Sequence, residues 1–551
     1  MTRTGGRRFD TGLLGAALLG AVTFSFLIGP TVLNPTNVRW LLIGDTAQNY
    51  LGWQFFRRTP LLQWPLGSNP DFGVGFASSI VFNDQIPGLA LLFKPLSPLL
   101  PREFQYFGWW LLTCFVFQAV FAWKLASLWL TRVAARYLVV GFLLIQPAWL
   151  HRMTFEGYGH LALSGHFLLL WALLLALHPR WSRWQWWGVL VTSLGVTLYL
   201  FIMVGIVYAF ALLRRASRTS DRRSAFGHGI VAVVIAGVQA WSFGMFMAGD
   251  TTDSGLGRYR ATIASPVDAF DGLGTTWSRI LPDVTSTPGS NEGFAFIGIG
   301  VLMLVVIAAA YVGVRRSWAV TQIIMPYWHL WAALSLLACL SLSPRIGIAE
   351  RELFSYAVPD ALLPIFSSLR SSGRLMWLPV YALTVVAIVR VMRVRTAGVW
   401  VVLFALLLQV TDSLTALRET RERFTDTDIT LVTDDPRWVD WTKGKKHLVS
   451  IPPLNNDPLW IDLATLADRH RLTTNAAYVS RTDIRRFERL IEVTQKNLES
   501  YTFDPDTLYI ITNYPPNPMS ATLRKRADDL GFKIHDIPVR GGDDALVILT
   551  Q

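Results

Sequence analysis

The sequence predicts a mainly α-helical protein: a polytopic transmembrane helical bundle of about eleven spans with a small C-terminal extracytoplasmic α/β domain. Three observations predict this class. Apolar residues make up 52% of the 551 residues and charged residues only 16%, whereas soluble domains carry about 25% charged residues. Apolar runs of about 20 residues recur along the chain, and the chain becomes polar after Asp412. With a mean hydropathy of +0.37, this composition excludes a disordered chain, a disulfide scaffold and an ordinary cytosolic enzyme.

The first span is expected over residues 11–33, which follow Arg3, Arg7 and Arg8. A signal peptide is the alternative, but the apolar run is longer than a typical h-region and no small-residue cleavage site follows it. We therefore expect a retained anchor with a cytoplasmic N-terminus. The other spans are expected near 104–130, 137–150, 160–177, 186–198, 200–213, 226–247, 294–313, 320–342, 375–390 and 397–411.

Arginine clusters set the predicted orientation. Alternating spans place short Arg-rich loops on one side, and the positive-inside rule makes that side cytoplasmic; these loops are 132–136, 180–183, 214–223, 315–316 and 390–395. The stretch 186–213 could be one long helix or two short ones, and Arg-rich loops at both of its ends favour two. The same clustering argues against nucleic acid as the partner despite a net charge of +12. Both cysteines, Cys114 and Cys339, lie in apolar runs, which excludes a disulfide framework.

Two domains are expected: a transmembrane domain over 1–411 and a soluble extracytoplasmic α/β domain over 412–551. An odd number of spans places the C-terminus outside the cytoplasm. The predicted extracytoplasmic loops are 34–103, 248–293 and 343–374, with a short loop at 151–159. Strand-like runs of the C-terminal domain are 447–451, 507–512 and 545–550. Prolines break the apolar stretch 86–100, so we expect a re-entrant or interfacial element there.

Asp45 lies in the segment 44–50, shortly after the first span. Near the membrane surface, partial desolvation makes a carboxylate more basic, as a general base requires. The alternative is that Asp45 caps the helix that follows. A second carboxylate, Asp84, lies later in the same loop, before Pro87. Asp84 could orient Asp45, bind a divalent ion together with it, or cap the Pro87 helix.

This arrangement resembles the GT-C superfamily of membrane glycosyltransferases, which use polyprenyl-phosphate-linked sugars as donors. The resemblance lies in the N-terminal anchor, the long first external loop with the early Asp45 and the later Asp84, and the soluble C-terminal domain. It covers the architecture of nearly the whole chain and implies that Asp45 deprotonates the acceptor hydroxyl. The superfamily's two carboxylates separated by one residue are absent, because Thr46 and Ala47 follow Asp45. A divalent cation, Mg²⁺ or Mn²⁺, is therefore left open.

The departing phosphate requires cations, and the planar guanidinium of arginine pairs well with phosphate oxygens. Arg370 and Arg374 belong to the segment 369–374, which resembles the Arg-x-x-Gly-Arg segments of related membrane glycosyltransferases. Backbone and hydroxyl donors between the two arginines would make a phosphate nest; alternatively, Arg374 snorkels to the interface and Arg370 is solvated. Arg258 could reach a phosphate or an acidic acceptor, or be a solvated surface residue. The pair Arg57-Arg58 is expected to anchor an interfacial helix to headgroups.

Further candidates lie in the polar loop 151–159 and just after it. His160 is expected either to hydrogen-bond the donor phosphate or sugar, or to close the end of a helix. Glu156 is a reserve acid–base candidate. His160 and His166 are six residues apart, so they cannot chelate a metal as an i, i+4 pair would. Glu292, just before the 294–313 span, is expected to cap that span.

The leading hypothesis is an inverting glycosyltransferase of the bacterial inner (cytoplasmic) membrane. Its partners would be a lipid-linked sugar donor, a glycan, lipid or protein acceptor, and membrane lipids, with no nucleic acid. The hypothesis requires Asp45, Arg370 and Arg374 to converge around a lipid headgroup at the outer leaflet. One alternative is a lipid or glycan transporter or flippase, although the charges lie mostly outside the spans. Another is a membrane assembly scaffold whose C-terminal domain binds a partner.

Overall fold

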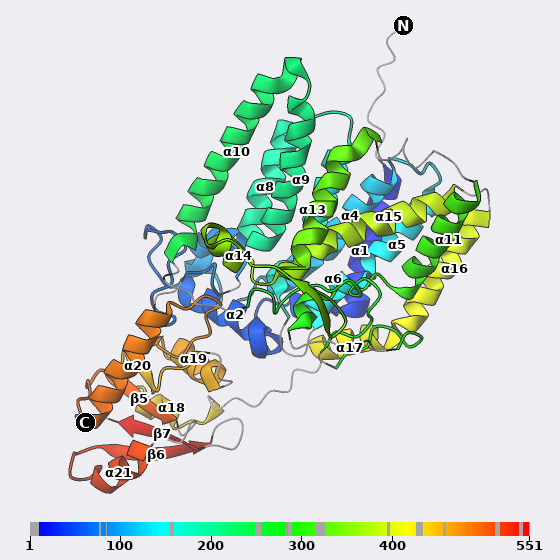
Figure 1. Ribbon diagram of the computed structural model, residues 1–551. Helices are drawn as coiled ribbons and strands as arrows, with labels where there is room; N and C mark the ends of the chain where they lie inside the picture. The colour runs from blue at the N-terminus through cyan, green and yellow to red at the C-terminus, as the bar shows by residue number, and fades with distance from the viewer. Residues whose placement is uncertain are drawn as a thin grey trace.

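The computed structural model is a helical bundle with one mixed β-sheet at the C-terminal end of the chain (Figure 1). This confirms the predicted class. The structure describes residues 10–549 except 77–78, 84, 155–158, 248, 250–254, 273, 283, 285–288, 316–324, 394–396, 426–433, 456–458, 513–517 and 539–543.

Each of the predicted spans contains a helix of the bundle. These helices are α1 Thr11–Leu27, α4 Phe107–Ala126, α5 Val133–Leu144, α6 Pro147–Thr154, α7 Phe167–Leu177, α8 Arg183–Val196, α9 Leu198–Ala216, α10 Arg222–Ser242, α11 Ile299–Arg315, α13 Trp328–Ser341, α15 Trp377–Met392 and α16 Ala397–Asp412. Among the described residues, four helices are long and apolar enough to cross a membrane, or up to six if each of two bent helix pairs counts as one span. The chain is thus a multi-pass membrane protein, and the number of about eleven spans stays a prediction.

The stretch 186–213 forms two helices, α8 and α9. They are separated at Thr197, whose backbone is extended (φ −164°, ψ 149°). The two helices pack against each other and against α10 (Figure 1). The arginines at both ends of the stretch therefore predicted the right number of helices.

The first loop contains α2 Gly44–Phe56 and α3 Pro87–Phe93. We expected the region around Arg57 and Arg58 to lie in the membrane interface, and this was wrong: residues 46–56 are all buried. Arg57 donates hydrogen bonds to the carbonyls of Pro101 (2.9 Å) and Arg102 (3.1 Å). Arg58 pairs with Asp468 of the C-terminal domain at 3.5 Å. Both arginines thus bind protein groups instead of lipid headgroups.

The remaining loops contain short elements that place the site. These are the β-hairpin of β1 Arg345–Ile348 and β2 Arg351–Ser355, helix α14 Leu363–Ser368, and the 3-10 turns η4 Leu161–Ser164, η7 Ser290–Gly293 and η10 Ser372–Met376. The turn η10 leads directly into α15, so its side chains have a fixed position on the bundle.

The C-terminal region begins with α17 Leu414–Thr425 and continues into an α/β unit. Its elements are α18 Trp438–Trp441, β3 His447–Ile451, α19 Leu459–Arg469, β4 Thr473–Thr474, α20 Ile484–Glu499, β5 Thr507–Thr512, α21 Pro518–Arg526, β6 Lys533–Pro538 and β7 Asp544–Leu549. The strand order is β4-β3-β5-β7-β6. β3 pairs in parallel with β4 and β5, whereas β7 is antiparallel to β5 and β6. The three predicted strands correspond to β3, β5 and β7.

Main-chain hydrogen bonds join the C-terminal unit to the first loop. The amides of Gly73 and Val74 both donate to the carbonyl of Thr474, at 3.0 and 2.9 Å. The amide of Thr474 donates in turn to the carbonyl of Asp71 at 3.1 Å. Helix α19 also contacts α2, which carries Asp45 in its first turn (Figure 1). The C-terminal unit is therefore packed directly on the loop that carries Asp45.

Candidate functional site

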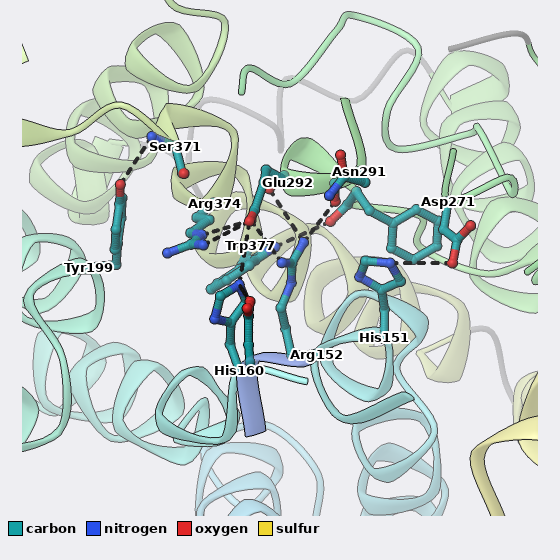
Figure 2. Close-up of polar contacts among 12 residues, drawn as sticks. His151, Arg152, His160, Tyr199, Asp271, Asn291, Glu292, Ser371, Arg374 and Trp377 are labelled. Atoms are coloured by element: carbon teal, nitrogen blue, oxygen red, sulfur yellow. Dashed lines mark hydrogen bonds and ion pairs between the residues drawn. The ribbon is translucent and has the colours of Figure 1, made fainter. Parts of the chain in front are cut away.

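Polar side chains from distant segments meet where the loops join the bundle (Figure 2). Glu292 of η7 lies at the centre, with Arg374 of η10 and Arg152 of α6 beside it. His160, just before η4, lies next to the same carboxylate, and Asp45 contacts His160 from the first turn of α2. We call these five residues the Glu292 cluster.

Glu292 accepts hydrogen bonds from two guanidinium groups. Arg374 binds it in a two-pronged geometry, with Nε to Oε2 and Nη2 to Oε1 both at 2.9 Å. Arg152 donates from Nη1 to Oε2 at 2.9 Å, and from Nη2 to the carbonyl of Asn291 at 2.8 Å. Two parallel N–H···O bonds between charged groups are among the strongest polar contacts in proteins. The two arginines are consequently held in fixed positions.

The charges around Glu292 determine its protonation. Burial by itself would raise the pKa of Glu292, but the positive charges of Arg374 and Arg152, together with the hydrogen bond from His160, hold the pKa well below its usual range. Glu292 is therefore ionised at neutral pH. It acts as a fixed anion that orients the two arginines and is a poor candidate for accepting a proton.

His160 links this anion to Asp45. Its Nε2 lies 3.3 Å from Oδ2 of Asp45 and 3.5 Å from Oε1 of Glu292. Arg423 of α17 also acts electrostatically on Asp45. The guanidinium of Arg423 lies close to Gly159, next to His160, because its Nη2 would be 3.2 Å from a Cβ added to that glycine. The side chain of Asp45 remains 13% exposed. The side chain of Glu292 is equally exposed, so the two carboxylates differ in their partners and not in their exposure.

Aromatic rings support both guanidinium planes. Arg374 lies over the ring of Tyr199 at 4.5 Å and Arg152 over the ring of Trp377 at 5.1 Å. The hydroxyl of Tyr199 accepts a hydrogen bond from the amide of Ser371 at 3.0 Å (Figure 2). Such rings favour a cation over their faces, so Arg374 and Arg152 remain charged and oriented although they are buried.

A second buried pair lies beside Arg152. His151 Nε2 is 3.5 Å from Oδ2 of Asp271, and both side chains are buried (Figure 2). The other oxygen of Asp271 accepts a hydrogen bond from the amide of Thr275 at 3.1 Å. This pair fixes the loop after α10 to α6 and thereby supports the position of Arg152.

The charges in and beside the cluster balance. The guanidinium groups of Arg152, Arg374 and Arg423 stand against the carboxylates of Asp45, Glu292 and Asp271, so no net charge remains when both histidines are neutral. Guanidinium groups are the side chains best suited to pair with phosphate oxygens.

The structure brings together three of the predicted site residues: Asp45, His160 and Arg374. Arg258 and Arg370 lie instead against the ring of Tyr259, at 5.4 and 6.0 Å from its centre. The remaining two predicted residues, Asp84 and Glu156, lie outside the described residues.

Two expected helix caps are absent. The N-cap residue of α2 is Ile43, and no side chain forms a capping hydrogen bond there. Asp45 lies inside the first helical turn, where a carboxylate is favoured by the helix dipole. Glu292 does not cap the following span either, because α11 begins only at Ile299. The carboxylates of Asp45 and Glu292 thus point to the cluster instead of to helix ends.

The predicted phosphate nest between Arg370 and Arg374 is also wrong. The amide of Gly373 donates to the carbonyl of Tyr259 at 3.0 Å, and the hydroxyl of Ser372 donates to the carbonyl of Ser341 at 3.4 Å. A Cβ added to Gly373 would lie 2.4 Å from Cα of Gly293. Glycine is required there for close backbone packing, and the donors between the arginines are used inside the protein.

Sequence reasoning missed the roles of Arg152, Glu292 and Arg423. Arg152 lies in the polar loop 151–159, but no local sequence pattern links it to Glu292, which is 140 residues away. Glu292 had been interpreted as a cap. A partner at such a separation can be recognised only when the fold is known.

The described residues contain no group of three His, Cys, Asp or Glu side chains that could hold a metal ion. Within the cluster, both oxygens of Glu292 are bound by guanidinium groups, which would repel a cation. These residues do not fit a divalent cation at Glu292.

No curated protein matches this chain. The solved structures that are similar to it include the following two. The crystal structure of ArnT from Cupriavidus metallidurans bound to undecaprenyl phosphate has a TM-score of 0.49 and 12% identity, covering 98% of both chains. The crystal structure of the Archaeoglobus fulgidus oligosaccharyltransferase, tethered with an acceptor peptide containing the NVT sequon via a disulfide bond, has a TM-score of 0.44 and 11% identity, covering 98% of this chain and 74% of that one.

Family models match both parts of the chain. A model described as domain of unknown function (DUF6311) matches residues 17–414, and a model of the DUF6311 C-terminal domain matches residues 437–532. The chain therefore belongs to the DUF6311 family.

Proposed function

We propose that this protein is an inverting membrane glycosyltransferase that moves a sugar from a polyprenyl-phosphate-linked donor to an extracytoplasmic glycan, lipid or protein. The observation that carries the proposal is the junction of Asp45 with Arg374 through His160 and Glu292. A partly exposed carboxylate next to oriented guanidinium groups supplies what this reaction needs: a base for the acceptor and positive charge for the leaving phosphate.

In the proposed reaction, Asp45 accepts the proton of an acceptor hydroxyl. The hydroxyl oxygen then forms a bond to the anomeric carbon on the face opposite the phosphate. The bond between that carbon and the phosphate oxygen breaks, and its electron pair stays on the phosphate. Arg374 stabilises the negative charge that the leaving phosphate gains. Arg370 and Arg258 lie further along the same loops, against the ring of Tyr259. The configuration at the anomeric carbon is inverted because a single displacement occurs.

We assign His160 to positioning instead of to phosphate binding. Its Nε2 lies between the carboxylates of Asp45 and Glu292, so its N–H can donate to either. Because Glu292 is ionised, it competes with Asp45 for this hydrogen bond. His160 would therefore fix the direction in which Asp45 faces the acceptor.

The wider setting of the proposal follows from the arginines and the loops. The Arg-rich ends of the helices would face the cytoplasm of a bacterial cell, and the Glu292 cluster would face the outer leaflet of its inner membrane. Residues 1–411 would form the transmembrane domain. The unit at 412–551, packed on the first loop, would recognise the acceptor.

The test is Asp45→Asn in the full-length protein, which keeps the size of the side chain and removes its basicity. Purified protein is mixed with polyprenyl-phosphate glucose, mannose or arabinose and with delipidated cell-envelope acceptor, and the release of free polyprenyl phosphate is measured. We expect the wild type to release it with one of these donors and Asp45→Asn to be slower by about 10²–10⁴-fold.

Asp360→Asn is the matched control, since Asp360 lies in an exposed turn of another extracytoplasmic loop. It should keep the wild-type rate. A wild-type rate in Asp45→Asn would reject Asp45 as the base. Donor movement across a vesicle membrane with no release of polyprenyl phosphate would favour a flippase.

A further inference from the structure

A cavity lies at the end of the bundle remote from the Glu292 cluster. Helix α15 begins next to Arg374 and runs for 16 residues, which corresponds to about 24 Å. The cavity is lined by residues from the C-terminal half of α15, such as Val385 and Arg390. It is also lined by the N-terminal end of α13, whereas the C-terminal end of α13 contacts η10. It therefore belongs to a different region of the protein from the proposed catalytic site.

The cavity is small and mostly apolar. Its volume is about 260 Å³, and its walls include Leu125 of α4, Leu173 of α7, Leu334 of α13 and Val385 of α15. Sites for drug-sized molecules usually have about 300–1,000 Å³. A space of this size and chemistry fits one hydrocarbon chain better than a polar metabolite.

Aromatic and basic side chains surround the same cavity. Tyr327 just before α13, Trp331 of α13 and Trp129 after α4 contribute rings to the lining. Tyrosine and tryptophan are enriched at the level of lipid headgroups. Arg390 and Arg393 complete the lining at the C-terminal end of α15. Apolar walls with rings and cations at one end match the order of groups in a phospholipid.

The two arginines have like charges and lie three residues apart, on the same face of the helix end. In the part of the chain that the structure describes, no carboxylate forms an ion pair with Arg390 or Arg393 within 4.0 Å. Such a pair of arginines is favourable when an anion lies between the two guanidinium groups.

We propose that this cavity binds an anionic phospholipid of the leaflet on the Arg-rich side of the protein. One acyl chain lies between α4, α7, α13 and α15, and the phosphate pairs with Arg390 and Arg393. Basic pockets between transmembrane helices on the cytoplasmic side commonly recognise anionic headgroups. The site is separate from the proposed transferase site, so it stands or fails independently of that function.

The experiment uses full-length protein in detergent, titrated with dioleoyl phosphatidylglycerol or dioleoyl phosphatidylcholine, and native mass spectrometry counts the bound lipid. We expect phosphatidylglycerol to bind more tightly, and the double variant R390Q/R393Q to weaken it by about 30-fold. R390K/R393K, which keeps both charges, should retain most of the binding. Ala382→Phe, which places a ring in the cavity, should block binding although both arginines remain.

The matched control is R218Q/R222Q, which removes two arginines from an Arg-rich loop on the same predicted side but away from the cavity lining. It should leave phosphatidylglycerol binding unchanged. Equal affinity of the wild type for the two lipids would overturn the proposal, and so would an equal loss in the control. Displacement of phosphatidylglycerol by undecaprenyl phosphate at a lower concentration would also overturn it, because the occupant would then be the carrier lipid.

Discussion

Replacing Glu292 by glutamine tests whether one carboxylate holds the proposed site together. The substitution keeps the shape of the side chain but removes the charge that faces Arg374 and Arg152. Three charge-assisted hydrogen bonds of 2.9 Å reach this carboxylate. The side chain of Arg152 is only 3% exposed and that of Arg374 is 10% exposed, so neither guanidinium could regain full hydration.

The expected cost follows from that burial. Removing one partner of a buried ion pair typically costs about 3–5 kcal/mol, because the remaining charge is left without compensation. Removing both partners costs less than the sum of the single changes. We therefore expect Glu292→Gln to lower the free energy of unfolding by about 3–5 kcal/mol, and the double variant E292Q/R152Q to lower it by less than the two single variants together.

The assay is equilibrium unfolding in mixed micelles, followed by tryptophan fluorescence, with Glu350→Gln as the control. Glu350 lies in the exposed turn between β1 and β2, and surface changes of this kind are usually within about 0.5 kcal/mol. The reasoning is refuted if the free energy of unfolding of Glu292→Gln lies within about 1 kcal/mol of the wild-type value. It is also refuted if the effects of Glu292→Gln and Arg152→Gln simply add, because the guanidinium groups would then not be held by Glu292.

The same pair of proteins gives a pH test. The pKa of Glu292 is well below its usual range in the folded protein, so the unfolded chain binds this proton first as the pH falls. The stabilisation is fully present above the ordinary carboxyl pKa of about 4.3 and is lost as the pH falls through the lower folded value. The stability difference between wild type and Glu292→Gln should therefore be constant from pH 7 to about 5 and shrink below pH 4.

Three further predictions concern groups around the site. Gly373→Ala should abolish transfer and lower expression of folded protein, because the new methyl group would lie 2.4 Å from Cα of Gly293; wild-type activity would show that this backbone contact is dispensable. Burial lowers the pKa of Lys94 to about 8, so Lys94→Met should be more stable than the wild type at pH 7, with the gap closing as the pH rises through 8 towards 10. A gap that does not depend on pH would contradict this. Arg58→Gln should increase proteolysis between the two units, since Arg58 pairs with Asp468; an unchanged cleavage rate would show that the pair contributes nothing to docking.

The sequence predicted the bundle well because its signals are local. An apolar run forms a helix wherever it enters lipid, and the arginines at both ends of 186–213 require an even number of helices. Helix α2 was misjudged because its polar face looks solvated. In the structure, Gln48 donates to the carbonyl of Phe82 at 2.9 Å, and Gln54 to that of Phe104 at 3.2 Å. Long-range partners of this kind cannot be identified from spacing.

At the site, too, local signals were predicted and long-range partners were missed. Asp45, Arg370 and Arg374 were expected to converge because topology placed all three on one side of the membrane. The structure brings Asp45 and Arg374 to one cluster, whereas Arg370 lies against Tyr259. The individual role of Glu292 was missed, since a carboxylate just before an apolar run has an adequate local explanation as a cap. Its actual partners lie 140 and 82 residues away in the chain, and only tertiary packing selects them.

The contacts of Gly73, Val74 and Asp71 with Thr474 join amides to carbonyls, and such atoms are common to nearly all amino acids. These contacts therefore restrain the backbone course of the two segments. The side chains are constrained as well, because Gly73 has a positive φ of 82° and Thr474 is buried. Substitutions on the outward surface of the C-terminal unit leave these main-chain bonds in place, so the unit stays attached to the loop that carries Asp45.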